Sequence, residues 1–334
     1  MDLLTQGLLG GVLAQSVADR DEKKLATLAG IAAGLLADAD ILIRSSSDPL
    51  LNVEYHRHFS HSLLFIPLGA ALAAMLLWPF LRRRISTRKL YVFCLAGYSL
   101  SGLLDACTSY GTQLFWPFSD ERVAFNIISI IDPIFTLSLL AALLSGLWFK
   151  HRVIAFAGIS FALSYLLFGY SQLQEAKSIA AELISSRGHV SQQQLVKPTL
   201  GNLLLWRSVY IFDERIYVDA VRVGIFKEDK IYEGESLKLF SLETDLRGLD
   251  MESTLYKDIE RFTRFSDGFV AFDPAQAHVI GDIRYSMLPM SGKPLWGIVI
   301  DPFHVQQHAD YRFFRDGSRE TRSMFIDLVL GRDE

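Results

Sequence analysis

The sequence predicts a mainly α-helical membrane protein, in which a polytopic transmembrane helical bundle is followed by an extracytoplasmic α+β domain. Long apolar runs fill residues 1–170, whereas residues 171–334 carry most of the charge. Over the whole chain of 334 residues, 50% are hydrophobic and 21% are charged. A typical soluble domain has about 25% charged residues. This composition excludes a disordered chain and disfavours an ordinary soluble enzyme.

Charge and cysteine content exclude further classes of protein. The formal net charge is −4, so no basic field points to nucleic acid as a partner. The two cysteines are too few for a disulfide scaffold or a four-cysteine zinc site.

Six apolar runs follow one another in residues 1–170. A helix of about 20 apolar residues can cross ~30 Å of hydrocarbon, and most of the runs reach or approach that length. The first run is shorter and is compatible with a tilted span, a half-helix or an interfacial helix. A buried helical core is the alternative, but so many runs exceed what one core of this size holds. The runs are Leu3–Ala18, Leu25–Ile43, His61–Phe80, Leu90–Cys107, Ile127–Phe149 and Val153–Tyr170.

The loops between the runs alternate between rich and poor in Lys and Arg. Leu81–Lys89 holds five basic residues, and Arg20–Lys24 holds three. Lys150 and Arg152 lie between the last two runs. Basic loops stay on the cytoplasmic side of a membrane. We therefore predict a multi-pass protein of the bacterial inner membrane with residues 171–334 outside the cytoplasm.

Residues 171–334 predict the soluble α+β domain. Gln172–Ser186 has the 3.6-residue periodicity of an amphipathic helix that leaves the membrane. Two runs rich in β-branched and aromatic residues, Ser208–Phe212 and Ile216–Phe226, flank the polar residues 213–215 and predict a hairpin. Further strands are predicted at Phe269–Phe272, His278–Ser286 and Leu295–Ile300, and further helices at Glu252–Arg264 and Arg319–Leu330.

Acids and histidines collect at the predicted outer ends of the apolar runs. Asp38 and Asp40 lie near the end of the second run, and His56, His58 and His61 precede or begin the third. Asp105 and Asp132 lie near the outer ends of the next two. The alternatives without a functional site are solvated acids at helix ends and a polar loop whose histidines cap a helix. The topology rests on Lys and Arg alone, so this convergence is independent of it and suggests a carboxylate–imidazole metal site.

The same residues resemble the YdjM-type membrane-bound metal-dependent hydrolases over roughly residues 1–150. The resemblance rests on Asp38-Ala39-Asp40, on His56-Arg57 with Ser60-His61-Ser62, and on Leu104-Asp105 with Thr108-Ser109-Tyr110-Gly111. It implies a bacterial inner-membrane helical protein and a metal-dependent hydrolase, distantly similar to zinc-dependent phospholipases C. Carried over position by position, it implies metal ligands at Asp40, His56, His61 and Asp105.

The chain departs from this family pattern at several positions. Gln6 and Ser101 stand where many members have histidine, and Ala37 replaces a proline. His58 falls at a position where glycine is commoner, so it need not be a ligand. Fewer imidazoles imply fewer metal ions, a more carboxylate-rich site, or no catalysis.

We therefore expect hydrolysis of an ester or phosphoester at the outer membrane surface by a divalent metal, with zinc first and manganese second. The substrate class that fits this depth is a lipid or lipid-linked phosphate in the bilayer. Asp38 or Asp132 would be the general base, and Arg57 would stabilise developing phosphate charge. Two alternatives remain, an ion- or proton-translocating membrane protein and a non-catalytic membrane scaffold.

Overall fold

The computed structural model describes residues 1–225 and 228–332 and divides the chain into two units. The first unit comprises Met1–Ile43, Tyr55–Ser171 and Leu200–Asn202. The second comprises Arg44–Glu54, Gln172–Thr199 and Leu203–Glu334. A helical N-terminal region followed by antiparallel sheets confirms the predicted order of the two parts. The extracytoplasmic placement of the second part stays a prediction.

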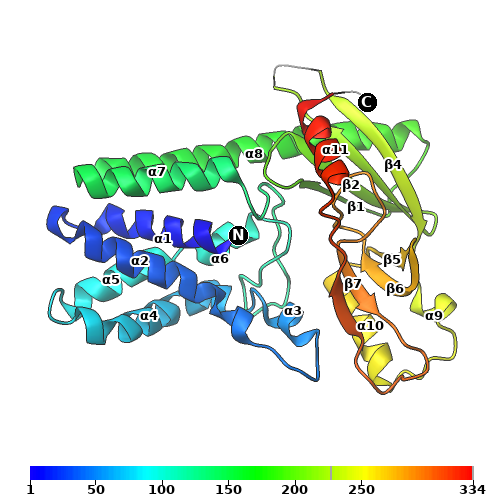
Figure 1. Ribbon diagram of the computed structural model, residues 1–334, viewed down its shortest axis with the longest axis horizontal. Helices are drawn as coiled ribbons and strands as arrows, with labels where there is room; N and C mark the ends of the chain where they lie inside the picture. Colours follow the sequence, from blue (N-terminus) through cyan, green and yellow to red (C-terminus); the bar gives the residue numbers. More distant parts are fainter. Residues whose placement is uncertain (226–227, 333–334) are drawn as a thin grey trace. The chain divides into compact units, whose positions relative to one another are not determined.

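The first unit is a bundle of helices (Figure 1). Its helices in the described residues are α1 (Leu3–Val17), α2 (Lys23–Ala37), α4 (Ile66–Leu81), α5 (Thr87–Tyr98), α6 (Ser101–Ala106), α7 (Pro133–Phe149) and the first part of α8 (Arg152–Ser186). Short 3-10 turns interrupt the chain between them, at η1 (Arg20–Glu22), η2 (Asp38–Leu42), η3 (Phe59–His61) and η4 (Leu63–Phe65). α1 packs against α2, α5 and α7, and α2 also packs against α4 and α5.

Within residues 1–225 and 228–332, three helical segments are long and apolar enough to cross a membrane, by length and composition: Arg20–Leu42, Leu63–Leu81 and Arg152–Ser186. α1 and α7 are shorter apolar helices. The predicted run Leu90–Cys107 is not one helix, because α5 ends at Tyr98 and α6 begins at Ser101. The Ser99 hydroxyl donates to the Ala96 carbonyl, 2.9 Å away, a side-chain bond that competes with the helical pattern.

Glycines let three helices meet backbone to backbone in the middle of the bundle. A Cβ added to Gly10 of α1 would lie 2.4 Å from the carbonyl oxygen of Gly30 in α2. A Cβ added to Gly97 of α5 would lie 2.5 Å from the same oxygen. Side chains therefore cannot separate these helices, and the interior is closed at this level.

The predicted basic loops share one end of the bundle. Lys89 makes ion pairs with Asp19 and Glu22, at 3.2 and 2.8 Å. Arg152 pairs with Asp19 at 2.7 Å. These exposed pairs contribute little to stability, but they show that the three loops lie together. This is expected if all three loops face the cytoplasm, as predicted.

The described residues of the second unit form two four-stranded antiparallel sheets, with strand orders β1-β2-β3-β4 and β5-β6-β7-β8. Helix α10 (Thr254–Phe265) packs Leu255, Ile259 and Phe262 into a core with Val270 and Ile298 of the second sheet. The remaining helices are α3 (Leu51–Tyr55), α9 (Leu242–Asp245) and α11 (Arg319–Leu330). The strands are β1 (Gln193–Pro198), β2 (Leu205–Phe212), β3 (Arg215–Arg222), β4 (Lys230–Lys238), β5 (Val270–Asp273), β6 (Gln276–Asp282), β7 (Trp296–Val299) and β8 (Asp310–Phe313).

The predicted hairpin is confirmed, with Phe212 paired to Arg215 across a two-residue turn. Asp213 and Glu214 both have positive φ, 49° and 57°, as a tight hairpin turn of this length demands. The predicted second strand ends early, at Arg222, and its last residue, Phe226, lies outside the described residues.

Other predicted elements of this unit shift or merge. The helix predicted at Gln172–Ser186 is the continuation of α8, which begins at Arg152 without a break. α11 has the predicted bounds. The sequence interpretation missed β1, β4 and β8.

Candidate metal centre

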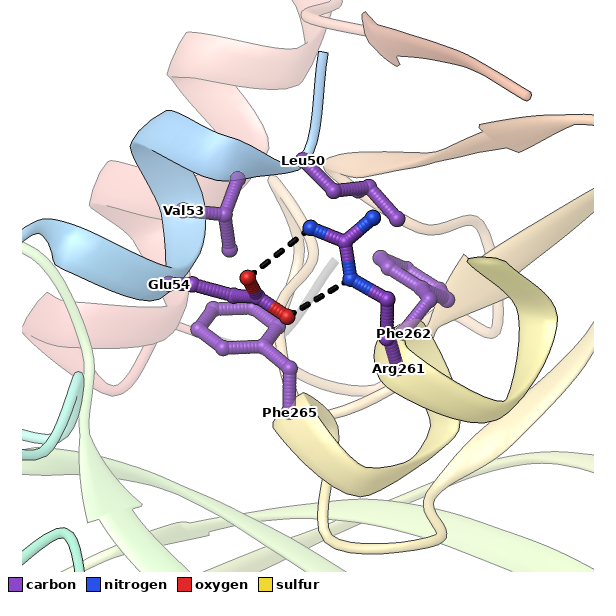
Figure 2. A pocket seen from close by; sticks show the side chains of 6 residues that line it. All are labelled: Leu50, Val53, Glu54, Arg261, Phe262 and Phe265. Atoms are coloured by element: carbon purple, nitrogen blue, oxygen red, sulfur yellow. Dashed lines mark hydrogen bonds and ion pairs between the residues drawn. The ribbon is translucent and has the colours of Figure 1, made fainter. Parts of the chain in front are cut away.

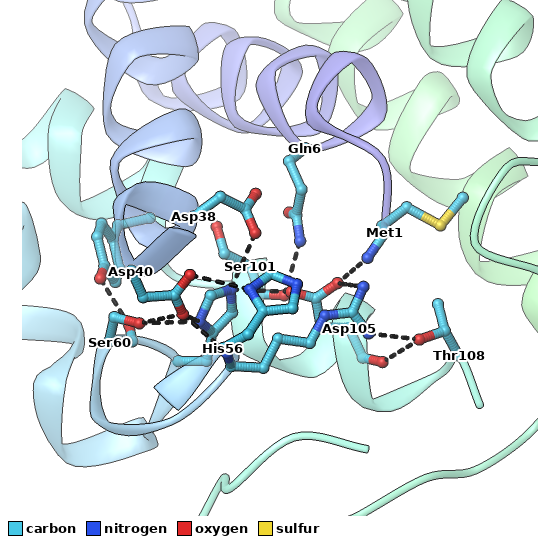
Figure 3. Close-up of polar contacts among 12 residues, drawn as sticks. Met1, Gln6, Asp38, Asp40, His56, Ser60, Ser101, Asp105 and Thr108 are labelled. Atoms are coloured by element: carbon cyan, nitrogen blue, oxygen red, sulfur yellow. Dashed lines mark hydrogen bonds and ion pairs between the residues drawn. The ribbon is translucent and has the colours of Figure 1, made fainter. Parts of the chain in front are cut away.

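Three segments of the first unit bring Asp38, His61 and Asp105 together. Asp38 opens the 3-10 turn η2, which tightens the end of α2, and His61 ends η3. Asp105 lies in α6. His61 Nε2 lies 2.9 Å from Asp105 Oδ2 and 3.4 Å from Asp38 Oδ1. Figure 3 shows how the labelled Asp38 and Asp105 approach the same region from different helices.

The three side chains form a potential metal-binding group. One ligand atom from each lies within 4.8 Å of the others, and all three residues are buried. A tetrahedral zinc ion holds its ligand atoms about 3.3 Å apart. Three protein ligands leave the fourth position open, which is the arrangement of catalytic zinc sites. An oxygen-rich set with one imidazole is also compatible with manganese.

The buried polar atoms of this group are compatible with a bound metal. Asp38 Oδ2 is buried and has no hydrogen-bond partner among the residues that the structure describes. His61 Nε2 and Asp105 Oδ2 are also buried, and they face each other at 2.9 Å. A buried polar atom without a partner costs about 1–3 kcal/mol, and more if it is charged. Two buried carboxylates and one imidazole in this arrangement could hold a cation.

Asp40 holds the surrounding loop rather than facing this group. Its Oδ2 accepts the Arg57 backbone N–H at 2.8 Å and the Ser60 hydroxyl at 2.9 Å. Its Oδ1 lies 3.0 Å from His56 Nδ1, and Oδ2 lies 3.2 Å from His61 Nδ1. A carboxylate on Nδ1 fixes the tautomer in which Nε2 is free to bind a metal.

Arg57 forms an ion pair with Asp105, the second carboxylate of the metal-binding group. Its Nη2 lies 3.1 Å from Asp105 Oδ1, and its Nη1 donates to the Thr108 hydroxyl at 2.8 Å. The side chain is 1% exposed and lies over the Tyr110 ring. The amino group of Met1 also contacts Asp105 Oδ1. Arg57 has φ of 58°, a conformation that a non-glycine residue keeps only when its surroundings enforce it.

His56 is partly exposed, with 23% of its side chain accessible. Burial lowers its pKa from 6.5 despite the hydrogen bond to Asp40. The ring is therefore neutral at pH 7. With a proton on Nδ1 towards Asp40, Nε2 can accept one.

Two residues singled out by the sequence lie outside the group. Asp132 caps α7, accepting the Phe135 N–H at 3.0 Å, and Tyr165 donates to both of its oxygens at 3.0 Å. The His58 ring lies among aromatic rings, 5.7 Å from that of Trp116. His58 adopts non-helical backbone angles, φ −92° and ψ −128°, immediately before η3.

Gln6 and Ser101, two of the positions that depart from the family pattern, contact each other. The Gln6 side-chain amide donates to the Ser101 carbonyl at 3.2 Å, and Gln6 Oε1 is buried without a hydrogen-bond partner in the described part of the chain. Figure 3 shows this contact between Gln6 and Ser101.

The sequence interpretation missed several supporting residues. The Tyr98 hydroxyl donates to the Ser60 carbonyl at 2.6 Å, and Thr108 links Arg57 to the Asp105 backbone. A Cβ on Gly102 would lie 2.1 Å from the His61 carbonyl oxygen, so α6 touches the histidine loop directly. Only the proximity of Ser60 and Thr108 to the motif residues could have indicated these roles.

Comparison with known proteins assigns the first part of the chain. The profile of a family described as YdjM inner membrane protein matches residues 1–176. The uncharacterized protein YfhP of Bacillus subtilis (strain 168) is 29% identical over 147 residues, which span 44% of this chain and 42% of that protein. No solved structure matches the chain.

Proposed function

Because the chain belongs to the YdjM inner membrane protein family, we propose that it is a metal-dependent hydrolase of the inner membrane, acting on an ester or phosphoester at the outer membrane surface. The observation that carries the proposal is the convergence of three buried side chains, Asp38, His61 and Asp105, whose ligand atoms lie within 4.8 Å of one another. A lipid or lipid-linked phosphate is the substrate class that suits a site on a membrane-embedded bundle.

The proposal assigns the metal to Asp38, His61 and Asp105, with zinc or manganese as the ion. When bound, the ion supplies Lewis acidity towards the scissile ester. Asp38 is thus a ligand rather than the general base, and Asp40 orients His61 rather than binding the ion. Asp132 has no part in this chemistry, because its oxygens are engaged by Phe135 and Tyr165.

The chain's own side chains supply the remaining functions. Arg57 holds Asp105 Oδ1 and keeps Oδ2 directed at His61. His56, neutral at pH 7, accepts a proton at Nε2 while Asp40 stabilises the cationic ring through Nδ1. The burial of the three ligands excludes bulk water, which strengthens their interaction with a cation.

Ion or proton translocation is the less favoured function. A conducting path would have to continue from this group towards the basic end of the bundle. Gly10, Gly30 and Gly97 close the interior between the two ends in this conformation.

The proposal is tested with purified protein in vesicles of bacterial inner-membrane lipids, by following release of the phosphate-bearing headgroup. We expect turnover that chelator abolishes and added Zn²⁺ or Mn²⁺ restores. His56→Gln should lower turnover by about 10²- to 10⁴-fold, as for a general base, while bound metal is retained. Asp132→Asn is the control and should leave turnover unchanged. A protein that binds metal but releases no headgroup would instead support the scaffold.

A further inference from the structure

The connection between α6 and α7 in the first unit exposes three phenylalanines that are close together in sequence. Phe115, Phe118 and Phe125 are 50%, 84% and 51% exposed. Apolar residues exposed singly are ordinary on a protein surface, whereas several on one short segment indicate an interaction surface. We call residues 115–125 the aromatic loop and propose that it lies in the headgroup region of the bilayer, with its phenylalanines towards the lipid. This inference goes beyond the proposed function, because it needs the membrane assignment and not the metal.

Exposed apolar side chains continue along the chain from the aromatic loop into α7. Ile130 and Ile131 precede this helix, Ile134 and Leu137 lie in its first turns, and all four are exposed. The chain belongs to an inner membrane protein family over residues 1–176, and α7 is one of its apolar helices. In a membrane-embedded bundle such exposed side chains face lipid. The aromatic loop is therefore continuous in sequence with a lipid-facing surface, and this continuity identifies the bilayer as its partner.

Charged residues on the same loop place it in the headgroup region and not in the hydrocarbon. Asp120 and Glu121 follow Phe118 closely and are exposed. The hydrocarbon core disfavours both charged side chains and irregular backbone that faces lipid. At the boundary between headgroups and acyl chains, by contrast, apolar side chains such as phenylalanine insert while polar neighbours stay hydrated. The mixture of side chains on the aromatic loop therefore fits this boundary.

Backbone hydrogen bonds hold the aromatic loop in shape. Thr112, just before the loop, and Val123 within it each donate an N–H to the carbonyl of the other, at 3.0 and 2.9 Å. The Phe118 N–H donates to the Phe115 carbonyl at 2.9 Å. Backbone groups that are paired inside the protein do not lose hydrogen bonds when they leave water. The loop can therefore contact lipid without unfolding.

The aromatic loop contacts the segment that carries the histidines of the candidate metal centre, within the same unit. The Trp116 ring lies 5.7 Å from the His58 ring and 6.1 Å from the Phe59 ring. Arg122 Nη1 donates to the His56 carbonyl at 3.1 Å. A bilayer contact at this loop therefore places the metal-binding group close to the lipid headgroups, which agrees with a lipid or lipid-linked phosphate as the proposed substrate.

The test attaches the fluorophore NBD to Phe118→Cys and measures its depth in the bilayer. The full chain carries Cys107→Ala, since Cys94 is buried and can stay, and is reconstituted in phosphatidylethanolamine–phosphatidylglycerol vesicles. Nitroxide lipids quench the fluorophore either near the headgroups or near the ends of the acyl chains. We expect emission to shift to shorter wavelength and to fall by about half with the headgroup nitroxide, at least about 2-fold more than with the deep one.

Two further labelled variants provide references for water and for hydrocarbon. Phe303→Cys lies in the second unit at a residue that is 92% exposed, and its label should show neither the shift nor the quenching. Leu144→Cys lies on the exposed face of α7, and its label should be quenched more strongly by the deep nitroxide.

Three results would overturn the proposal. A label at position 118 that behaves like the label at position 303 would show that the loop lies in water. A shift without quenching by either nitroxide would show that protein, and not lipid, covers the loop. Stronger quenching by the deep nitroxide would place the loop in the hydrocarbon. If the labelled variant does not fold, Phe118→Trp takes its place, and quenching of the added tryptophan by brominated lipids is compared with the wild type. The readout is independent of bound metal, so it distinguishes failure of this inference from failure of the proposed function.

Discussion

Asp38 and Asp40 are both buried, yet their contacts give them different roles. Asp38 Oδ1 faces His61 Nε2, whereas Asp40 engages His56, Arg57 and Ser60. The sequence predicted Asp40 as a metal ligand and Asp38 as a general base, whereas these contacts lead us to propose Asp38 as the ligand and Asp40 as the residue that orients His61. Two acids two positions apart look equivalent in the sequence, and only the 3-10 turn and the returning histidine loop distinguish them.

Asp40→Asn tests this assignment at a single side chain. The substitution keeps the volume but removes the charge that holds His61 Nδ1, so metal affinity should fall about 10- to 100-fold. Asp38→Asn removes a ligand and should abolish high-affinity binding. Isothermal titration with Zn²⁺ distinguishes the two. A mild effect of Asp38→Asn beside complete loss in Asp40→Asn would restore the roles that the sequence predicted.

At the scale of elements, the break between α5 and α6 positions Asp105. The hydropathy of Leu90–Cys107 predicts one apolar helix. It does not predict that the helix is interrupted at Ser99 and Leu100. Hydropathy also does not predict that the polar loop Arg44–Glu54 belongs to the second unit, with Leu50 in that unit's core (Figure 2). Such features depend on contacts distant in sequence, which is why the sequence predicted the helices but not the arrangement of the site.

Gly102→Ala tests the contact between α6 and the histidine loop. The added methyl group would lie 2.1 Å from the His61 carbonyl, so the loop or the helix must move. We expect metal affinity to drop at least about 10-fold, although no ligand is altered. Gly7→Ala is the control in the same unit, because its Cβ would meet side chains only at 3.4 Å or more. Equal affinities for the two variants would show that α6 does not restrain His61.

The packing of the segment Arg44–Glu54 should also depend on pH. Burial raises the pKa of Asp48, but the Arg261 hydrogen bond and charge outweigh it and lower the pKa below 3.8. An aspartate with a depressed pKa stabilises the fold above its unfolded value of about 3.9 and loses this contribution as pH falls through the folded value. Amide hydrogen exchange in residues 44–54 should therefore remain slow at pH 5 and accelerate below pH 4, corrected for intrinsic exchange. Unchanged protection at pH 3 would show that the packing of Leu50 alone keeps residues 44–54 in place.

At the scale of the molecule, the sequence predicted a helical membrane part and a separate α+β part. It placed α10, α11 and the β2–β3 hairpin, because each has a local pattern. It missed β1, β4 and β8, whose residues become strands through pairing with neighbours rather than through an alternating pattern of their own. β4, for example, is mostly exposed along its length.

The predicted topology is testable by reporter fusions. A reporter that is active only in the periplasm should be active after Glu334 and silent when inserted near Arg84, because Leu81–Lys89 carries five basic residues. The opposite pattern would place the metal centre on the cytoplasmic side.

The bound metal of the detergent-purified chain tests the central claim, a single centre on Asp38, His61 and Asp105, most directly. Elemental analysis should find about one zinc or manganese ion per chain in the wild type. His61→Ala and Asp105→Ala should each lose it, the double variant should lose little more, and Asp132→Asn should keep it. Chelator should lower the melting temperature of the wild type and not of His61→Ala. Full metal content and unchanged chelator sensitivity in both single alanine variants would contradict the shared centre.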